Sequence, residues 1–126
     1  MFLKMDIFRP KPLIGIVGVC ASGKTTLNAG LTALGFNCRH IAQEHSYVPT
    51  MWRRITNPDI LIYLEVSYEN TIARKSLNWT RDEYDQQIFR IRDAINNAQI
   101  RINTDQLTPQ QLIDRVVKEL EIYLNQ

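Results

Sequence analysis

Cysteine and histidine are scarce in this sequence of 126 residues, which contains two of each. Cys20 lies inside a glycine-containing segment, so we do not expect a structural disulfide with Cys38, and two free thiols are typical of a reducing cytoplasm. Neither His40 nor His45 is paired with a cysteine at zinc-finger spacing. The sequence therefore predicts neither a disulfide framework nor a structural zinc site.

The sequence also lacks a large excess of charge of either sign and long apolar runs. The net charge of +2 is too close to balance to indicate nucleic acid or an anionic membrane as a partner. No apolar run approaches the roughly 20 residues that span a bilayer. The N-terminal MFLKMDIFRPKP has charges and prolines where a signal peptide has its apolar core. We expect a cytoplasmic protein with a leader at residues 1–12 and one domain at residues 13–126.

Short apolar runs alternate with segments of helical periodicity. The expected strands are residues 13–17, 36–42, 60–66 and 100–102. The expected helices are residues 24–34, 68–77, 80–98 and 108–124, with one helical turn at 50–55 inside a loop at 43–58. Strands that alternate with helices favour an α/β fold. We therefore expect a three-layer domain with a mostly parallel sheet of about four strands and helices on both faces.

Two of the expected helices begin with recognisable capping signals. Thr80 is followed three residues later by Glu83, and Thr108 by Gln111, which is the spacing of a capping box. Trp79 directly precedes the first of these caps, where an apolar side chain forms a hydrophobic staple. These signals predict helix starts at Thr80 and Thr108.

The segment GVCASGKT is the most informative part of the chain. Gly18, Gly23, Lys24 and Thr25 match the pattern G-x-x-x-x-G-K-[ST] at every fixed position, between an expected strand and an expected helix. Such a loop points successive backbone N–H groups inward, and the helix N-terminus adds positive potential. Lys24 would contact the β- and γ-phosphates of a nucleotide, and the Thr25 hydroxyl would ligate Mg²⁺.

Eight residues of this segment are expected to surround the phosphates, namely Gly18, Cys20, Ala21, Ser22, Gly23, Lys24, Thr25 and Thr26. A chance match to the pattern in a chain of this length has a frequency of about 0.5% at average residue usage. The alternative is a glycine-containing turn that binds nothing. Cys20 is expected to act as a small apolar residue, with a redox-sensitive thiol at a helix N-terminus as the alternative.

At these residues the chain resembles the P-loop NTPases, and within them the branch of small-molecule and nucleotide kinases. PDILIYLEVSYENTIAR (58–74) is similar to the late core strand and arginine-bearing helix of shikimate, gluconate and thymidylate kinases. NWTRDEYDQQIFRIRD (78–93) takes the place of their lid, and RINTDQLTPQQLIDRVVKEL (101–120) resembles their last strand, adenine-side loop and closing helix. The resemblance implies binding of Mg-ATP, or another purine nucleoside triphosphate, and γ-phosphoryl transfer to a small acceptor.

Phosphoryl transfer needs cations around the transferred group and an acid near the acceptor. The resemblance makes Arg74 a lid arginine that reaches the phosphates, and a solvated helix face is its alternative. Glu44 follows the second expected strand, at the edge where open α/β sheets bind ligands, and is the candidate base. The alternative is that Glu44 and His45 are ordinary polar loop residues. Glu65 is either a magnesium-associated acid or merely the end of a strand.

Other polar residues are weaker candidates. The further lid cations are Lys75, Arg81, Arg90 and Arg92, of which we expect the last two on a solvated face. Trp52 beside Arg53 and Arg54 could hold a second nucleotide, a sugar phosphate or a nucleic-acid backbone, but we favour a Trp packed on the sheet with two surface arginines. By resemblance, residues 103–105 border the adenine ring.

Two departures from the kinase pattern favour a second hypothesis. The family has an acid-ending strand before the late core strand, whereas only residues 43–59 lie in that interval here. The part of the chain available to bind an acceptor is also short. The second hypothesis is a nucleotide-binding regulatory or partner module with weak or no turnover.

Overall fold

The computed structural model describes residues 11–75 and 78–126, so most of the expected leader lies outside the described residues. In chain order the elements are β1 (Leu13–Val17), α1 (Lys24–Ala33), β2 (Asn37–His40), the 3₁₀ turn η2 (Gln43–His45), α2 (Met51–Ile55), β3 (Ile60–Glu65), α3 (Tyr68–Lys75), α4 (Arg81–Arg90), α5 (Arg92–Asn97), β4 (Ile100–Asn103) and α6 (Pro109–Leu124).

The four strands form one parallel sheet in the order β2-β1-β3-β4. β1 is a central strand, with Ile14 opposite both Cys38 of β2 and Ile60 of β3. Because all strands run the same way, their carboxyl ends meet at one edge of the sheet. The segments that follow β1 and β2 are therefore neighbours at that edge, as open α/β sheets require of a ligand site.

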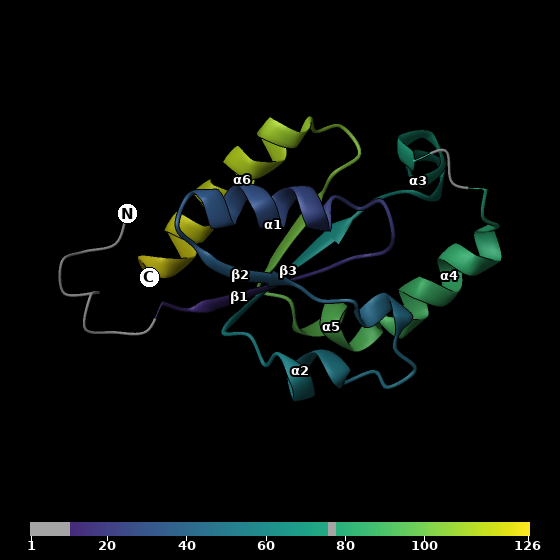
Figure 1. Ribbon diagram of the computed structural model, residues 1–126, viewed down its shortest axis with the longest axis horizontal. Helices are drawn as coiled ribbons and strands as arrows, with labels where there is room; N and C mark the ends of the chain where they lie inside the picture. Colours follow the sequence, from purple (N-terminus) through teal and green to yellow (C-terminus); the bar gives the residue numbers. More distant parts are fainter. Residues whose placement is uncertain (1–10, 76–77) are drawn as a thin grey trace.

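Helices cover both faces of the sheet, which confirms the expected three-layer α/β architecture (Figure 1). α1 and α6 lie on one face, and α2 and α5 lie on the other. The first core joins alternate strand residues such as Ile16 and Ile62 to Leu27 of α1 and Val116 of α6. The second core joins Val17, Leu61 and Tyr63 to Trp52 of α2, Ala94 of α5 and Ile91, which lies between α4 and α5.

Both predicted capping boxes are present. The Thr80 side chain accepts from the N–H of Glu83, and the Glu83 carboxylate accepts from the N–H of Thr80. Thr108 and Gln111 make the same reciprocal pair at the start of α6. The expected staple also forms, because the Trp79 ring packs edge-on against Tyr84, with ring centroids 6.0 Å apart.

The prediction of one continuous helix over residues 80–98 is wrong. The helix is interrupted at Ile91, which ends α4 and caps α5 with φ −97° and ψ 7°. Ile91 is fully buried in the second core, so packing of its side chain outweighs helix continuity at this position. The second strand is also shorter than expected, covering 37–40, because the chain turns into η2 at residue 43.

The described residues include no helix that is both long and apolar enough to cross a membrane. The expected helical turn inside the long loop is present as α2. The end of the helix predicted over residues 68–77 lies outside the described residues, as does the side chain of Lys75.

Candidate functional site

The loop between β1 and α1 has the backbone geometry that its glycines suggest. A Cβ atom on Gly18 would lie 2.4 Å from Ser22 Oγ and 2.9 Å from the Leu64 carbonyl oxygen, so no larger residue fits. Gly23 has φ +107°, a left-handed conformation that favours glycine. Ala21 also adopts a positive φ of 67°, which is uncommon for a residue with a side chain. The loop therefore packs closely against Leu64 of β3.

The first turn of α1 begins without a side-chain cap. Gly23 caps the helix without a side-chain hydrogen bond. The first N–H groups of a helix have no partner inside it and carry its positive dipole end. Thr25 and Thr26, in the same turn, are exposed and line a cavity. This turn has the properties of an anion-binding site.

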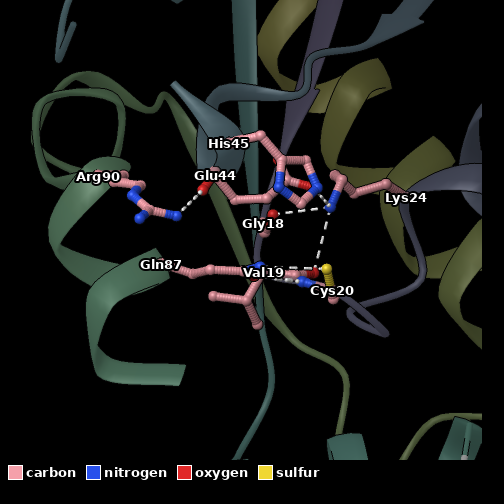
Figure 2. A network of polar contacts seen from close by, with 8 residues as sticks. All are labelled: Gly18, Val19, Cys20, Lys24, Glu44, His45, Gln87 and Arg90. Carbon is pink, nitrogen blue, oxygen red and sulfur yellow. Dashed lines mark hydrogen bonds and ion pairs between the residues drawn. The ribbon is translucent and has the colours of Figure 1, made fainter. Parts of the chain in front are cut away.

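Lys24 is the buried cation of the loop. Its Nζ donates to the carbonyl oxygens of Gly18 (2.7 Å) and Val19 (3.1 Å) and forms an ion pair with Glu44 Oε2 at 2.8 Å (Figure 2). An ammonium group has three N–H donors, and three acceptors surround it here. Lys24 is therefore held against the loop by all three donors.

Glu44 belongs to η2 and is not an ordinary solvated loop residue, because it is only 4% exposed. One carboxylate oxygen, Oε2, binds Lys24, whereas Oε1 is buried and has no hydrogen-bond partner among the described residues. His45 Nε2 lies 3.8 Å from Oε2 on the exposed side. Glu44 therefore borders the loop between β1 and α1, and its expected role as a base stays a prediction.

Hydrogen bonds of the neighbouring residue Gln43 hold the segment that carries Glu44 in place. Its side-chain amide donates to the carbonyl oxygens of Val48 (2.9 Å) and Arg90 (3.2 Å), and its Oε1 accepts from the N–H of Trp52 (2.7 Å). Gln43 is 1% exposed. These bonds attach η2 to α2 and α4, so the next residue, Glu44, is directed toward the loop.

Arg90 also contacts η2, so the prediction of a purely solvated position is wrong for this residue. Its Nη1 donates to the Glu44 carbonyl oxygen (3.3 Å), and its guanidinium stacks on the Tyr47 ring at 4.6 Å. Arg92 does remain exposed and stacks on Phe89. Arg90 thus connects α4 to the segment that carries Glu44.

A cavity of about 780 Å³ opens in front of the loop. Its lining includes the loop and first helical turn, together with residues from β2, η2, α3 and the start of α6. The lining residues used below are Cys20, Ala21, Ser22, Gly23, Lys24, Thr25, Thr26, Glu44, His45, Arg74, Thr104, Leu107 and Leu112. Apart from Gly18, which is buried behind Ser22, every residue predicted to surround the phosphates therefore lines one cavity.

Arg74 extends from α3 to the other side of the loop. Nη1 donates to the carbonyl oxygen of Ala21 (3.1 Å) and to Thr104 Oγ1 (2.9 Å), and Nη2 donates to the Thr104 carbonyl oxygen. Thr104 in turn donates from Oγ1 to the Ser22 carbonyl oxygen (3.2 Å). Arg74 therefore connects α3, the loop between β1 and α1 and the end of β4.

The residues expected to border an adenine ring have different surroundings. Thr104 is buried and lines the cavity. Asp105 instead accepts from the Ser67 N–H (2.9 Å). Burial alone would raise the pKa of Asp105, but hydrogen bonds from Ser67 and Asn70 lower it below its usual range. Asn103 donates to Glu65 (3.1 Å), so Glu65 pairs with the neighbouring strand and does not line the cavity.

Two other sequence candidates are placed away from the loop. Trp52 is 7% exposed, belongs to the second core and donates from Nε1 to Asp93, so the favoured interpretation of a packed Trp is confirmed. Arg81 pairs with Asp85 at 3.1 Å on the exposed face of α4. Neither side chain lines the cavity.

Sequence reasoning missed Gln87, which lies in α4 and is 7% exposed. Its Oε1 accepts from the Cys20 N–H (2.9 Å), and its Nε2 donates to Cys20 Sγ (3.2 Å) (Figure 2). One amide thus orients both the backbone and the thiol of Cys20. No local sequence pattern could indicate this contact, because the two residues are 67 positions apart.

A scan of the chain against protein-family models finds no match, and a search of curated proteins finds none either.

Proposed function

We propose that the chain binds Mg-ATP, or another purine nucleoside triphosphate, at residues 18–26 and transfers its γ-phosphoryl group to a small acceptor. The observation that carries this proposal is the position of Lys24. This buried cation borders a cavity of about 780 Å³, at the start of a helix that has no side-chain cap. Small-molecule sites commonly have volumes of about 300–1,000 Å³. The size of the cavity, the charge of Lys24 and the N–H donors at the start of the helix together suit a nucleoside triphosphate.

The residues of the loop have separate tasks in this proposal. The N–H groups at the start of α1 bind phosphate oxygens, and Lys24 exchanges a loop carbonyl or Glu44 for a β- or γ-phosphate oxygen. Thr25 offers an exposed hydroxyl at the cavity, which suits a ligand of Mg²⁺. When bound, Mg²⁺ neutralises charge on the phosphates. Leu107 and Leu112 supply apolar surface in the same cavity for the purine ring of the nucleotide.

Glu44 is the proposed base for the transfer. An acceptor hydroxyl oxygen forms a bond to the γ-phosphorus, the bond from that phosphorus to the ADP oxygen breaks, and the hydroxyl proton passes to the carboxylate. Oε1 of Glu44 suits this task because it is buried without a hydrogen-bond partner and belongs to a cavity-lining residue. The products are ADP and the phosphorylated acceptor.

The second candidate is a nucleotide-binding regulatory module with weak or no turnover. The observations that favour it are the bonding of Lys24, whose three donors are already matched, and the bonding of Arg74. The lid role that the kinase resemblance implies for Arg74 requires its guanidinium to leave Thr104 and the loop carbonyls. A protein that keeps these bonds would bind a nucleotide without promoting transfer.

The test is calorimetric titration of Mg-ATP and Mg-ADP into the wild type, Lys24→Ala and Lys118→Ala. Lys118 is an exposed lysine on α6 and serves as the matched control. We expect the wild type and Lys118→Ala to bind equally, and Lys24→Ala to bind about tenfold or more weakly, since a hydrogen bond to a charged group is lost. Circular dichroism of each variant verifies that it is folded.

The same samples are then assayed for ADP release with nucleosides, sugars and small acids as acceptors. Acceptor-dependent ADP release supports the kinase-like function. Tight binding with no release across the acceptors supports the regulatory module. If the folded wild type binds neither nucleotide, the proposed function is wrong.

A further inference from the structure

Three side chains with different ligand atoms meet beside the phosphate loop. One ligand atom each from Cys20, Glu44 and His45 lies within 4.8 Å of the other two. Cys20 belongs to the loop, whereas Glu44 and His45 are consecutive residues of η2 (Figure 2). We propose that these three residues form a binding site for a divalent cation of borderline softness, for which Zn²⁺ is the reference ion.

The unpartnered oxygen of Glu44 is the observation that points to a ligand. Glu44 is 4% exposed, and its Oε1 is buried with no hydrogen-bond partner within the described part of the chain. A buried charged oxygen without a partner is costly, and native proteins rarely leave one unsatisfied. Lys24 occupies only Oε2. A cation at Oε1 would satisfy the remaining oxygen beside Lys24, and the His45 imidazole, whose Nε2 lies 3.8 Å from Oε2, would have to turn toward Oε1 to join it.

The thiol of Cys20 is oriented for such a cation. Gln87 Nε2 donates to Sγ at 3.2 Å, and Gln87 Oε1 accepts from the Cys20 N–H at 2.9 Å. Because Gln87 is buried, its amide holds the sulfur in one orientation. Hydrogen bonds to a ligand atom, made by residues outside the metal's own coordination, are a usual feature of protein metal sites.

His45 can complete the site with a small movement. Its side chain is 60% exposed, so the imidazole is free to rotate. The ligand atoms of one tetrahedral zinc ion lie about 3–4 Å apart, given Zn–N and Zn–S bonds of about 2.0–2.3 Å. The ligand atoms, which lie within 4.8 Å of one another, therefore have to approach by up to about 1 Å, and the exposed His45 imidazole is the ligand most free to move.

The set of ligand atoms selects the kind of ion. A thiolate and an imidazole favour Zn²⁺ and similar transition metals, whereas Mg²⁺ prefers oxygen ligands alone. The thiolate of Cys20 supplies one negative charge for the cation, and the carboxylate of Glu44, which also pairs with Lys24, supplies a second; the thiol proton passes to the buffer as the Zn–S bond forms. Three protein ligands leave a fourth position open, here toward the cavity that all three residues line.

This proposal does not rest on the proposed nucleotide function. The cation binds to the chain without nucleotide, so the binding can be measured in its absence. All three ligands also line the cavity of the proposed nucleotide site, at residues other than Thr25, where Mg²⁺ is expected. Because Glu44 Oε1 cannot bind Zn²⁺ and accept a proton at once, bound Zn²⁺ would exclude the proposed role of Glu44 as the base. Failure of ATP binding would leave the zinc prediction intact, and the reverse also holds.

The experiment is calorimetric titration of ZnCl₂ into the full chain, kept reduced and free of nucleotide. The chain offers matched controls, because it has two cysteines and two histidines. We expect one site in the wild type, a loss of affinity of about tenfold or more in Cys20→Ser and in His45→Gln, and no change in Cys38→Ser or His40→Gln. Millimolar Mg²⁺ should not compete.

Cobalt supplies a readout that a merely structural effect would not change. Co²⁺ bound to a thiolate gives a near-ultraviolet charge-transfer absorption, which should be present in the wild type and Cys38→Ser and absent in Cys20→Ser. His45→Gln keeps the test valid if Cys20→Ser does not fold, because His45 is exposed. Absence of zinc binding to the wild type, or unchanged affinity in His45→Gln and Cys20→Ser, would overturn the proposal.

Discussion

Lys24 Nζ and Glu44 Oε2 lie 2.8 Å apart and form a buried ion pair between the phosphate loop and η2. Their side chains are 10% and 6% exposed. The pair connects the segments that follow two adjacent strands, β1 and β2, at the carboxyl edge of the sheet. The cation that the proposed function assigns to phosphate binding is thus already paired with the proposed base.

This pairing predicts a strong energetic coupling between the two residues. Lys24→Met leaves a buried carboxylate without its cation, which should lower the free energy of unfolding by about 3–5 kcal/mol. Glu44→Gln should cost less, because Lys24 keeps its two carbonyl acceptors. The double variant has no unpaired carboxylate. Its decrease in the free energy of unfolding should therefore be smaller than the sum of the two single decreases, by about 1–3 kcal/mol. Urea unfolding of the four proteins measures this coupling, and simple additivity would contradict it.

Tyr63 predicts a loss of stability at high pH. Burial, followed by the charges of Glu65 and Tyr84 and partly offset by Arg101, raises the pKa of Tyr63 from 10.0 to about 12. The folded state therefore binds the phenolic proton more tightly than the unfolded state does. The resulting stability is fully present below pH 10 and is lost as the pH rises through 12.

Absorbance of tyrosinate, followed as the pH is raised, tests this prediction. One of the five tyrosines should titrate near pH 12 in the wild type, and this last step should be missing in Tyr63→Phe. Urea unfolding should show that stability falls less between pH 10 and pH 12 in the variant. If all tyrosines of the folded wild type titrate near pH 10, burial of Tyr63 does not control its ionisation.

The capping box at the start of α6 predicts a measurable contribution to global stability. Thr108 Oγ1 accepts from the Gln111 N–H at 3.1 Å, and α6 packs three buried side chains, Leu112, Val116 and Leu120, onto the first core. Thr108→Ala removes this acceptor and should destabilise the protein by about 1 kcal/mol. Thr108→Ser keeps a hydroxyl and should remain close to the wild type. Thermal unfolding distinguishes the two, and equal stabilities would show that the cap is unimportant.

The sequence was sufficient for features that depend on neighbouring residues. The strand–loop–helix order at residues 13–33, the capping box at Thr108 and the buried stripe of α6 all follow from local spacing. Interactions between distant segments were not predictable in this way. The break at Ile91 arises from burial against the far face of the sheet, and Cys20 meets Gln87 only because α4 returns to the loop.

In the candidate site, too, features set by neighbouring residues were predictable and contacts between distant segments were not. The tight loop between β1 and α1 could be predicted because its glycines occupy spacings that the backbone geometry demands, whereas phosphate binding at this loop stays a prediction. The proposed zinc site could not be predicted, since Cys20 and His45 are 25 positions apart in the sequence and follow the ends of different strands. A spacing rule for zinc fingers detects ligands that are close in sequence, whereas a parallel sheet brings ligands together from separate crossovers.

Arg74 offers a test of whether its guanidinium braces the loop or contacts a phosphate. Its donors bind the Ala21 carbonyl oxygen and both oxygens of Thr104, a forked arrangement that a lysine cannot reproduce. Arg74→Lys should therefore lower the free energy of unfolding by about 1–3 kcal/mol. The substitution should also weaken the binding of Mg-ATP and of Mg-ADP by the same factor, because a loosened loop affects the contacts to the phosphates that both nucleotides share.

Calorimetry with both nucleotides, alongside urea unfolding, measures these two effects, and Arg92→Lys on the exposed end of α5 is the matched control. Arg92 does not line the cavity, so its variant should bind both nucleotides as the wild type does. If Arg74→Lys weakened ATP much more than ADP while stability stayed unchanged, the guanidinium would have to contact the γ-phosphate. The bracing role would then be wrong, and the lid role that the kinase resemblance implies would account for Arg74 instead.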